Sequence, residues 1–357
     1  ARRRPRVAVV TLLPPTASGV ADHSAALLDE MARLADVTAF VADDVAPATV
    51  TTPPYPVRRL GLLPDLVRGG AFDTVLYTMG NNVLHRPFLE VLEQVPGHVL
   101  FHDVRLSDCY TPDERQAMAE QHYPDDTHPR PLYAAAVAHA ARSCLVHSQH
   151  AADVLAADCG VTARNVGPLP MKPWLVTGID AVTPPADEGV WIVTAGVADV
   201  VKQTHVFVAA AEIVLARRPE WNAAVVGLGG ERFVDAGSRV VATGRVSALE
   251  YPRWMARATV LVQLRARSNG ESSAAVADAI ANGIPAVATD LGATSELPDE
   301  VVVKVPRDVT PEQLAEVIEA LAADPERRAR QSAAALQYAA ANDMRAEARR
   351  ILAAIVT

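Results

Sequence analysis

The residues best suited to chemistry lie in the segment 265–290. Its pattern predicts the end of a strand, a polar loop, a helix of small residues and then another apolar strand. Its chemically capable side chains are, in chain order, Arg265, Glu271, Ser272, Ser273 and Asp278. The free backbone N–H groups of a helix N-terminus, beside a guanidinium group, form a natural seat for a phosphate. The segment therefore predicts a phosphate-binding loop.

Glu271 is an acid in this electropositive place. Its carboxylate would repel a phosphate unless it points elsewhere, and the hydroxyls of a sugar attached to that phosphate are the simplest target. The loop therefore predicts a site for a sugar-nucleotide diphosphate.

Two further cations follow predicted strands in the second half of the chain. Lys202 comes shortly after the strand 190–194 and could neutralise a phosphate, although a lone lysine is more often a solvated surface residue. Arg245 follows Thr243-Gly244 and is as well explained by simple exposure as by a diphosphate contact.

The first half offers polar residues at the ends of its predicted strands. Gly19 opens a helix where a diphosphate could approach the backbone closely, and a turn glycine is the equal alternative. His102 and Asp103 end a strand and could bind polar substrate groups, and histidine also transfers protons near neutral pH. Asn81 and His85 could contact an acceptor or merely stabilise their loop.

Apolar β-branched runs alternate with helical patterns along nearly the whole chain. This alternation is typical of α/β folds with parallel sheets built from βαβ units. Strands are predicted near 7–13, 37–41, 74–77, 98–101, 143–146, 190–194, 223–226, 240–243, 260–264, 284–289 and 301–305. Helices are predicted near 20–34, 132–142, 148–156 and 250–258. One further helix is predicted to end at 217, and an interrupted helical stretch is predicted over 310–355.

The order of these elements predicts two doubly wound, Rossmann-like parallel-sheet domains facing each other across a cleft. In such sheets, ligands bind outside the carboxyl ends of the strands. We expect an N-terminal acceptor domain over 1–170, a Pro-rich linker over 171–187 and a donor domain over 188–335. The last helical segment, 336–357, is expected to pack back on the first domain.

Composition narrows the function classes. The 357 residues carry a net charge of −9, which argues against nucleic acid as a partner. No apolar run is long enough to span a membrane, so we expect at most a peripheral association. Three scattered cysteines and no signal-peptide cleavage site favour a cytoplasmic protein. The acidic pairs Asp43-Asp44 and Asp125-Asp126 are expected in solvated loops, so no metal is predicted. The oligomeric state is left open.

With these residues in view, the chain resembles the family-four retaining glycosyltransferases of the GT-B fold, nearly from end to end. The resemblance rests on several segments in the expected order: the first loop at 13–23, Gly80–His85, Phe101–Asp103, Val146–Ser148, the Lys202 loop and the turn at Gly244-Arg245. The most specific match is the sequence Gln263-Leu-Arg-Ala-Arg-Ser-Asn-Gly-Glu-Ser-Ser273, continuing to Ala281-Asn-Gly-Ile-Pro285 and Thr289-Asp-Leu-Gly292.

The resemblance implies that a sugar moves from a nucleoside diphosphate, UDP or GDP, to an acceptor hydroxyl with retained configuration and no cofactor. His102 would line the reaction centre, and Glu271 would bind the transferred sugar. The diphosphate would be held by Lys202 and Arg265 and by the backbone at Gly19, Ser272 and Ser273, with Arg245 uncertain between a diphosphate contact and exposure. Asp278 would bind the ribose. Asn81, His85 and Asp103 remain the candidates for the acceptor, a small molecule or a glycan.

The chain departs from the family pattern in two places. Many relatives carry two glutamates eight positions apart, whereas Glu271 and Asp278 are seven apart. Many also carry Gly-Arg-Leu where this chain has Gly196-Val-Ala198. A sugar-nucleotide epimerase, a cyclitol-coupling relative or a non-catalytic nucleotide-sugar binder are the alternatives. A role in bacterial secondary metabolism or cell-surface glycan synthesis is the expected context.

Overall fold

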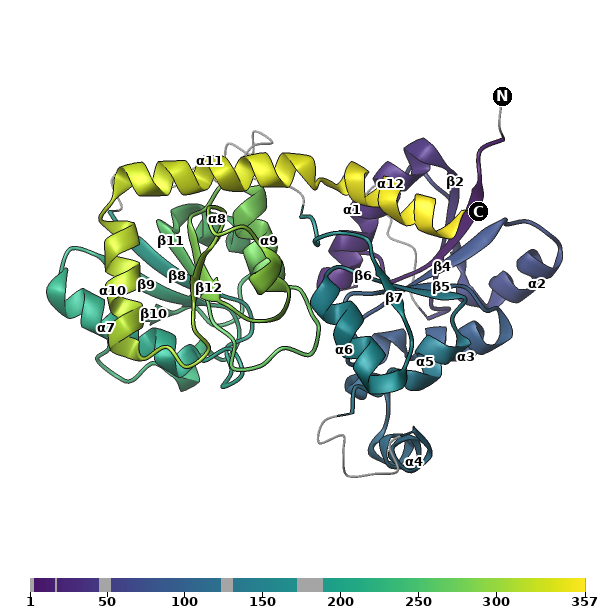
Figure 1. Ribbon diagram of the computed structural model, residues 1–357, viewed down its shortest axis with the longest axis horizontal. Coiled ribbons are helices and arrows are strands. Elements are labelled where there is room, and N and C mark those ends of the chain that lie inside the picture. The colour runs from purple at the N-terminus through teal and green to yellow at the C-terminus, as the bar shows by residue number, and fades with distance from the viewer. Residues whose placement is uncertain (1–2, 17, 45–52, 123–130, 172–188, 357) are drawn as a thin grey trace. The chain divides into compact units, whose positions relative to one another are not determined.

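The computed structural model divides into two compact units (Figure 1). The residues that it describes are 3–16, 18–44, 53–122, 131–171 and 189–356. The first unit comprises residues 1–169, 269–272 and 342–357, and the second comprises 170–268 and 273–341. Apart from Met171, the predicted linker over 171–187 lies outside the described residues.

The first unit is built on a seven-stranded parallel sheet of order β3-β2-β1-β4-β5-β6-β7. Its strands are β1 (Arg6–Val10), β2 (Asp36–Val41), β3 (Val57–Arg59), β4 (Thr74–Met79), β5 (His98–Phe101), β6 (Ser143–Val146) and β7 (Ala163–Asn165). Every residue of the central β4 is buried. A parallel sheet is covered on both faces, and this is why the strand sequences are continuous apolar runs.

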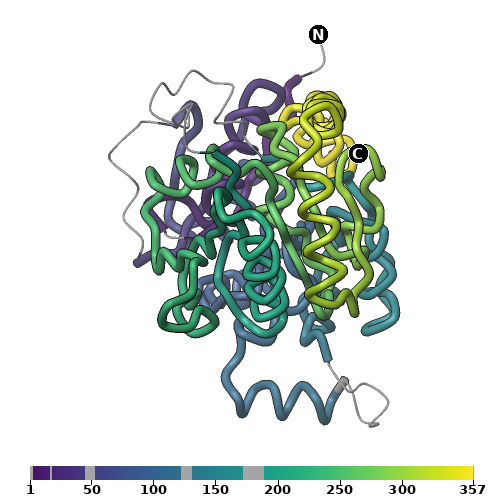
Figure 2. The backbone as a smooth tube through the Cα atoms, turned by 90° about the vertical axis from the view of Figure 1, so that its left-hand side faces the viewer, coloured from purple at the N-terminus to yellow at the C-terminus, as the bar shows by residue number. Residues whose placement is uncertain are grey.

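Helices complete the unit, and all of them except α4 pack close to the sheet or to one another. They are α1 (Gly19–Leu34), α2 (Leu63–Arg68), α3 (Arg86–Gln94), α4 (Pro112–His122), α5 (Ala135–Ala140), α6 (Gln149–Cys159) and α12 (Met344–Ile355), with 3-10 turns η1 (Leu60–Leu62), η2 (Val83–His85) and η3 (Ser107–Cys109). No residue of α4 is recorded as buried, and Figure 2 shows this helix, in blue, standing clear of the rest of the unit.

The second unit repeats the design on a six-stranded parallel sheet of order β10-β9-β8-β11-β12-β13. Its strands are β8 (Trp191–Ala195), β9 (Asn222–Val226), β10 (Val240–Ala242), β11 (Val260–Gln263), β12 (Ala286–Thr289) and β13 (Val303–Val305). Its helices are α7 (Thr204–Arg217), α8 (Glu250–Arg257), α9 (Ala274–Ala281), α10 (Pro311–Ala322) and α11 (Pro325–Ala341), with 3-10 turns η4 (Gly230–Arg232) and η5 (Gly292–Glu296).

The strand order reverses once in each sheet, between β1 and β4 in the first unit and between β8 and β11 in the second. Loops that leave neighbouring strands at such a point run in opposite directions and open a crevice for ligands. The predicted α/β class with two parallel sheets is confirmed. The loops that leave the strands at these two points carry Gly19 and Gly80 in the first unit, and Lys202 and Arg265 in the second.

The last helix, α12, packs against α1 within the first unit. Asp343 caps its N-terminus by accepting a hydrogen bond from the Ala346 N–H at 2.7 Å. Its buried face includes Ile351 and Ile355, which share a core with Leu27 and Met31 of α1. The second unit continues to Ala341, six residues beyond the predicted end of the donor domain at residue 335.

Two parts of the helix prediction differ from the structure. The helix expected over 132–142 shortens to α5, because Tyr133 has a φ of 58°, in the left-handed region that an α-helix excludes. Short elements such as α3 and β7 were not predicted. A helix of two to three turns, such as α3, and a strand of three residues, such as β7, are too short for a clear periodic pattern.

We expect Ile351→Ala to destabilise the first unit by about 2–5 kcal/mol, because it empties a fully buried site on α12. Urea unfolding, together with hydrogen exchange of the α12 amides, measures this loss. Arg345→Ala, at an exposed position of the same helix, is the control and should change stability by less than about 0.5 kcal/mol. Equal losses in both variants would contradict the packing of α12.

Candidate functional site

A lysine or arginine follows each of four neighbouring strands in the second unit. In the spatial order β10, β9, β8 and β11, these residues are Arg245, Arg232, Lys202 and Arg265. Because the carboxyl ends of parallel strands meet at the same edge of a sheet, the four cations lie along one edge. Such an edge favours an anion with several negative charges.

Glycines bring the loops of this edge into close contact. Gly196 has a φ of 110° and Gly227 a φ of 126°, which L side chains rarely adopt. A Cβ on Gly227 would stand 2.3 Å from the Gly196 carbonyl oxygen, so no side chain fits there. Gly227 also forms an isolated bridge with Gly244, one residue before Arg245. The loops after β8, β9 and β10 are therefore joined through their backbones.

The Lys202 loop is held by its own polar groups. The Lys202 N–H donates to Asp199 Oδ1 at 2.7 Å, and the Asp199 N–H donates to Thr204 Oγ1 at 3.2 Å. The ammonium folds back over Gly196, where a Cβ would stand 2.8 Å from Lys202 Nζ. The small residue at 196 thus leaves room for the cation at the end of β8.

Arg232 is a member of this edge that sequence reasoning missed. Its guanidinium donates to the carbonyl oxygens of Ala198, at 2.9 Å, and Gly229, at 3.3 Å. Arg232 therefore links the loop after β9 to the loop after β8. The glycine-rich turn Gly227–Gly230 was the only signal in the sequence, and nothing in it pointed to the arginine that follows.

The loop after β11 carries Arg265 and Glu271. The Arg265 N–H donates to Thr289 Oγ1 at the end of β12, at 2.9 Å. The half-buried Glu271 accepts the Asn269 N–H at 2.6 Å through Oε2, across a turn in which Gly270 has a φ of 87°. The carboxylate is therefore held by its own loop.

The predicted helix start after this loop is confirmed. Ser273 is the N-cap of α9, and its hydroxyl accepts the Val276 N–H at 3.4 Å. Ser272 is half-buried and directly precedes the cap.

Asp278, expected to face a ribose, lies on the buried side of α9 with only 9% of its surface exposed. Tyr251 of α8 donates its hydroxyl to Asp278 Oδ2 at 2.9 Å. This bond ties α9 to α8 and gives the carboxylate a structural partner. The ribose role of Asp278 stays a prediction.

In the first unit, Gly19 is the first residue of α1, and Ser18 caps the helix by accepting the Val20 N–H at 3.3 Å. Gly19 is exposed, and a Cβ there would have no neighbour within 4 Å among the described residues. Nothing in that part of the chain requires glycine at this position, and the donor contact of Gly19 stays a prediction.

The structure gives His85 a structural role in place of the expected acceptor contact. Its side chain is fully buried in η2 beneath Gly80, and burial lowers its pKa to about 4. Asn81 Oδ1 accepts the Asp108 N–H at 2.7 Å, and Cys109 Sγ donates to the Gly80 carbonyl at 3.4 Å. These bonds hold the loop after β4. An acceptor role for Asn81 stays a prediction.

His102 follows β5, and its backbone N–H donates to the Met79 carbonyl at 2.8 Å. Burial lowers the pKa of His102 well below 6.5, and neighbouring histidines lower it further. Its imidazole is therefore neutral at pH 7 and does not titrate there, in contrast to the ordinary behaviour expected from the sequence. Asp103 is half-buried beside it in the chain.

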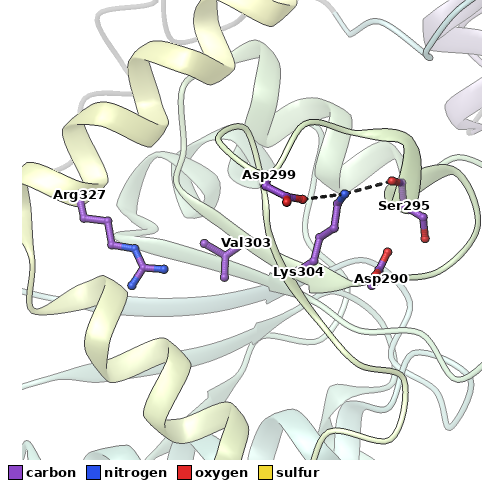
Figure 3. A pocket seen from close by; sticks show the side chains of 6 residues that line it. All are labelled: Asp290, Ser295, Asp299, Val303, Lys304 and Arg327. Carbon is purple, nitrogen blue, oxygen red and sulfur yellow. Dashed lines mark hydrogen bonds and ion pairs between the residues drawn. The ribbon is translucent and has the colours of Figure 1, made fainter.

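A pocket of about 750 Å³ opens elsewhere in the second unit (Figure 3). It is lined by Asp290, Ser295, Asp299, Val303, Lys304 and Arg327. Lys304 Nζ donates to the Ser295 carbonyl at 3.0 Å and pairs with Asp299 at 2.9 Å, so its charge is already compensated. None of the predicted site residues lines this pocket.

Within the described ranges, no cluster of three or more His, Cys, Asp or Glu side chains could hold a metal ion. Asp43 instead accepts the Gly61 N–H at 3.1 Å, and Asp125-Asp126 lie outside those ranges. None of the helices in the described part of the chain is both long and apolar enough to cross a membrane.

We expect Gly227→Ala to destabilise the second unit by about 2–5 kcal/mol, since the backbone strain and the clash with the Gly196 carbonyl add. Gly237→Ala is the matched control: its φ is 94°, but a Cβ meets no described atom within 4 Å, so about 1–2 kcal/mol is expected. Tryptophan fluorescence during urea unfolding measures both. Equal losses would show that the contact between the loops is absent.

The lowered pKa of His85 makes stability depend on pH. Between pH 6.5 and about 4, the unfolded chain binds a proton at this residue that the folded chain excludes. The free energy of unfolding should therefore fall as the pH falls through this window. In His85→Gln the slope should be smaller by up to about 1.4 kcal/mol per pH unit. His205→Gln, at an exposed position of α7, is the control, and an equal change in both variants would contradict the effect of burial.

Comparisons with known proteins identify relatives of the second unit and of the fold. Residues 189–324 match the family model described as glycosyl transferases group 1. A comparison with curated proteins gives no match. Sucrose-phosphate synthase from Thermosynechococcus elongatus aligns with 98% of this chain and 100% of its own, at 17% identity and a TM-score of 0.66.

Two further solved structures share the fold over their full length. HepE from Anabaena, in complex with UDP and glucose, aligns with 99% of this chain and 100% of its own, at 14% identity and a TM-score of 0.66. The trehalose-6-phosphate structure from E. coli, bound with UDP-2-fluoro glucose, covers 98% of each chain at 14% identity and a TM-score of 0.64. Residues 189–324 therefore form a group 1 glycosyltransferase domain, and the chain as a whole has the GT-B fold of glycosyltransferases.

Proposed function

We propose that this glycosyltransferase moves a sugar from a nucleoside diphosphate donor to an acceptor hydroxyl and retains the anomeric configuration. The observation that carries the proposal is the cationic edge of the second unit, where four neighbouring strands are each followed by a lysine or arginine. A diphosphate is the group in a sugar nucleotide that such an edge fits.

On this proposal, Lys202 and Arg265 hold the diphosphate, because they follow β8 and β11, on the two sides of the point where the strand order reverses. Arg245 is exposed and lies one strand further out, next to the Gly227 bridge, so it would contribute at longer range. The N-terminus of α9 at Ser272 and Ser273 would donate N–H groups to this anion, and a backbone contact of Gly19 with the donor stays a prediction.

Glu271 would accept hydrogen bonds from hydroxyls of the transferred sugar. Its bond to the Asn269 N–H orients the carboxylate before the sugar arrives. Oriented groups of this kind lower a barrier because they need no reorganisation during the reaction. Asp278 would bind the ribose.

The chemistry needs electrostatic stabilisation of the leaving diphosphate more than it needs a nucleophile. The leaving group's own oxygen would take the proton of the acceptor hydroxyl on the same face of the sugar as the new bond. No carboxylate then has to form a covalent intermediate, in contrast to retaining glycosidases. The cations would offset the charge of the diphosphate, and no metal is invoked.

The first unit would bind the acceptor near the ends of β4 and β5, with Asp103 and Asn81 as candidate contacts. His102 would line the reaction centre as a neutral imidazole, since its pKa is lowered by burial. A neutral ring can accept a hydrogen bond from one hydroxyl and donate to another. Secondary metabolism or cell-surface glycan synthesis, in the cytoplasm of a bacterium, stays the predicted context.

The nucleotide of the donor is best identified by thermal shift with a panel of UDP and GDP sugars. A ligand at 100 times its Kd stabilises the folded chain by about 2.7 kcal/mol, which raises Tm measurably. UDP sugars are expected to give the larger shift, because two structures with the same fold hold UDP or a UDP sugar. No shift with any member of the panel would reject the proposed donor class.

Glu271→Ala should reduce transfer from the best donor by roughly 100-fold or more, because the sugar loses its oriented acceptor group. The variant should keep the wild-type Tm. Glu300→Gln, which removes an exposed carboxylate from the second unit, is the control and should keep full activity. Product analysis with a labelled donor separates a transferase from an epimerase, which releases no glycoside. Undiminished turnover in Glu271→Ala would reject the role given to this residue.

A further inference from the structure

A fully buried carboxylate lies in the core of the first unit, where the proposed chemistry has no use for it. Glu347, in the first turn of α12, has no exposed surface. Its Oε2 lies 3.1 Å from His23 Nε2 of α1, and its Oε1 lies 3.6 Å from His147 Nδ1, just after β6. Within the described residues, neither carboxylate oxygen has a hydrogen-bond partner that satisfies strict geometry.

A carboxylate in such a place needs a compensating positive charge, because the interior solvates an isolated anion poorly. The ion pairs formed by the described residues give Glu347 two imidazole partners and no lysine or arginine. An imidazole offers the charge only when it is protonated. One of the two imidazoles therefore has to carry the proton that compensates the carboxylate. His23 makes the shorter contact with Glu347.

The same two imidazoles flank His102. The ring centroids of His23 and His102 are 4.7 Å apart with an interplanar angle of 73°, an edge-to-face arrangement. The rings of His102 and His147 are stacked, with centroids 5.1 Å apart and an angle of 28°. His102 is thus held between two rings, and both of these rings contact Glu347.

The charge distribution over the three rings follows from their surroundings. Burial lowers the pKa of His147 to about 4 although Glu347 raises it. Burial, and then the positive forms of its neighbours, lower the pKa of His102. Glu347 lies closer to His23 than to His147, so His23 is the ring that pairs with the carboxylate.

We propose that Glu347 is a positioning residue for His102. It forms an ion pair with His23, and this charged pair and His147 together keep the His102 ring neutral and in one orientation. This inference rests on the proposed function, which places His102 at the reaction centre. It gives α12 a role in activity beyond packing, since the carboxylate reaches the histidines only when this helix is docked on α1.

Several titratable or charged groups face this cluster, and each affects its protonation. They are His23 of α1, His85 of η2, His102 after β5, His147 after β6, and Glu347 and Arg350 of α12. Arg350 also donates from Nε to the Val166 carbonyl at 2.5 Å, which fixes its position in α12.

The test is ¹⁵N NMR of the histidine side chains in the full chain, at about pH 7.5, where an ordinary imidazole is mostly neutral. We expect one imidazole in the wild type with both nitrogens protonated, and we expect His23→Gln to remove that signal. In Glu347→Gln the signal should disappear and the His102 resonances should shift. If the wild type shows no doubly protonated imidazole, the inference is wrong, and this outcome needs no variant to fold.

Kinetics provide the second readout. Glu347→Gln should lower kcat for transfer by roughly 10- to 100-fold, because His102 loses its fixed geometry, while KM for the donor stays within about twofold. The pH dependence of kcat in Glu347→Gln should differ from that of the wild type. Glu347→Asp keeps the charge and should recover part of kcat.

Ile351→Val is the matched control for packing, since it trims a buried side chain of α12 and leaves every charge in place. It should lower Tm but keep the wild-type NMR signals and pH profile. If Glu347→Gln lowers kcat no more than Ile351→Val does, or leaves the His102 resonances unchanged, the positioning role is wrong. If the wild type forms no glycoside with any donor, the proposed function fails, and the NMR result still decides whether Glu347 and His23 form an ion pair.

Discussion

The constraint on which the rest of this structure depends is that all strands of a parallel sheet end at the same edge. Residues far apart in the chain, such as Lys202 and Arg265, come to one place because β8 and β11 are neighbours. The strand order of the sheet brings these separate cations together along one electropositive edge.

Glycines make that edge close enough to act as a unit. At Gly196 and Gly227 the backbones approach so nearly that any side chain would collide with a carbonyl or an ammonium group. The resulting contact fixes the loops after β8 and β9 to each other. Arg232 strengthens the same junction with two hydrogen bonds to carbonyl oxygens. Rigid loops of this kind keep charges oriented before a ligand binds, and this is where electrostatic stabilisation is strongest.

The first unit buries polar groups at the ends of its strands. Thr11 and Thr78 pair their hydroxyls at 2.6 Å between β1 and β4, the strands at which the order reverses. His85 is buried as a neutral ring that supports its loop. His23, His102 and His147 meet Glu347, a carboxylate from the opposite end of the chain. The unit thus depends on α12 for a charge as well as for apolar packing.

The sequence by itself determined the class of fold, most strands, the start of α1 at Gly19 and the start of α9 near Ser272 and Ser273, because apolar periodicity and helix-start signals are local. It also pointed to Lys202, Arg265 and Glu271 through the loops that carry them. Only the tertiary structure decided that Tyr133 delays α5, that His85 is buried, and that Asp278 is bonded to Tyr251. It alone brought Glu347 to His23. These outcomes depend on which elements pack together, and packing between distant segments leaves no periodic trace in either segment.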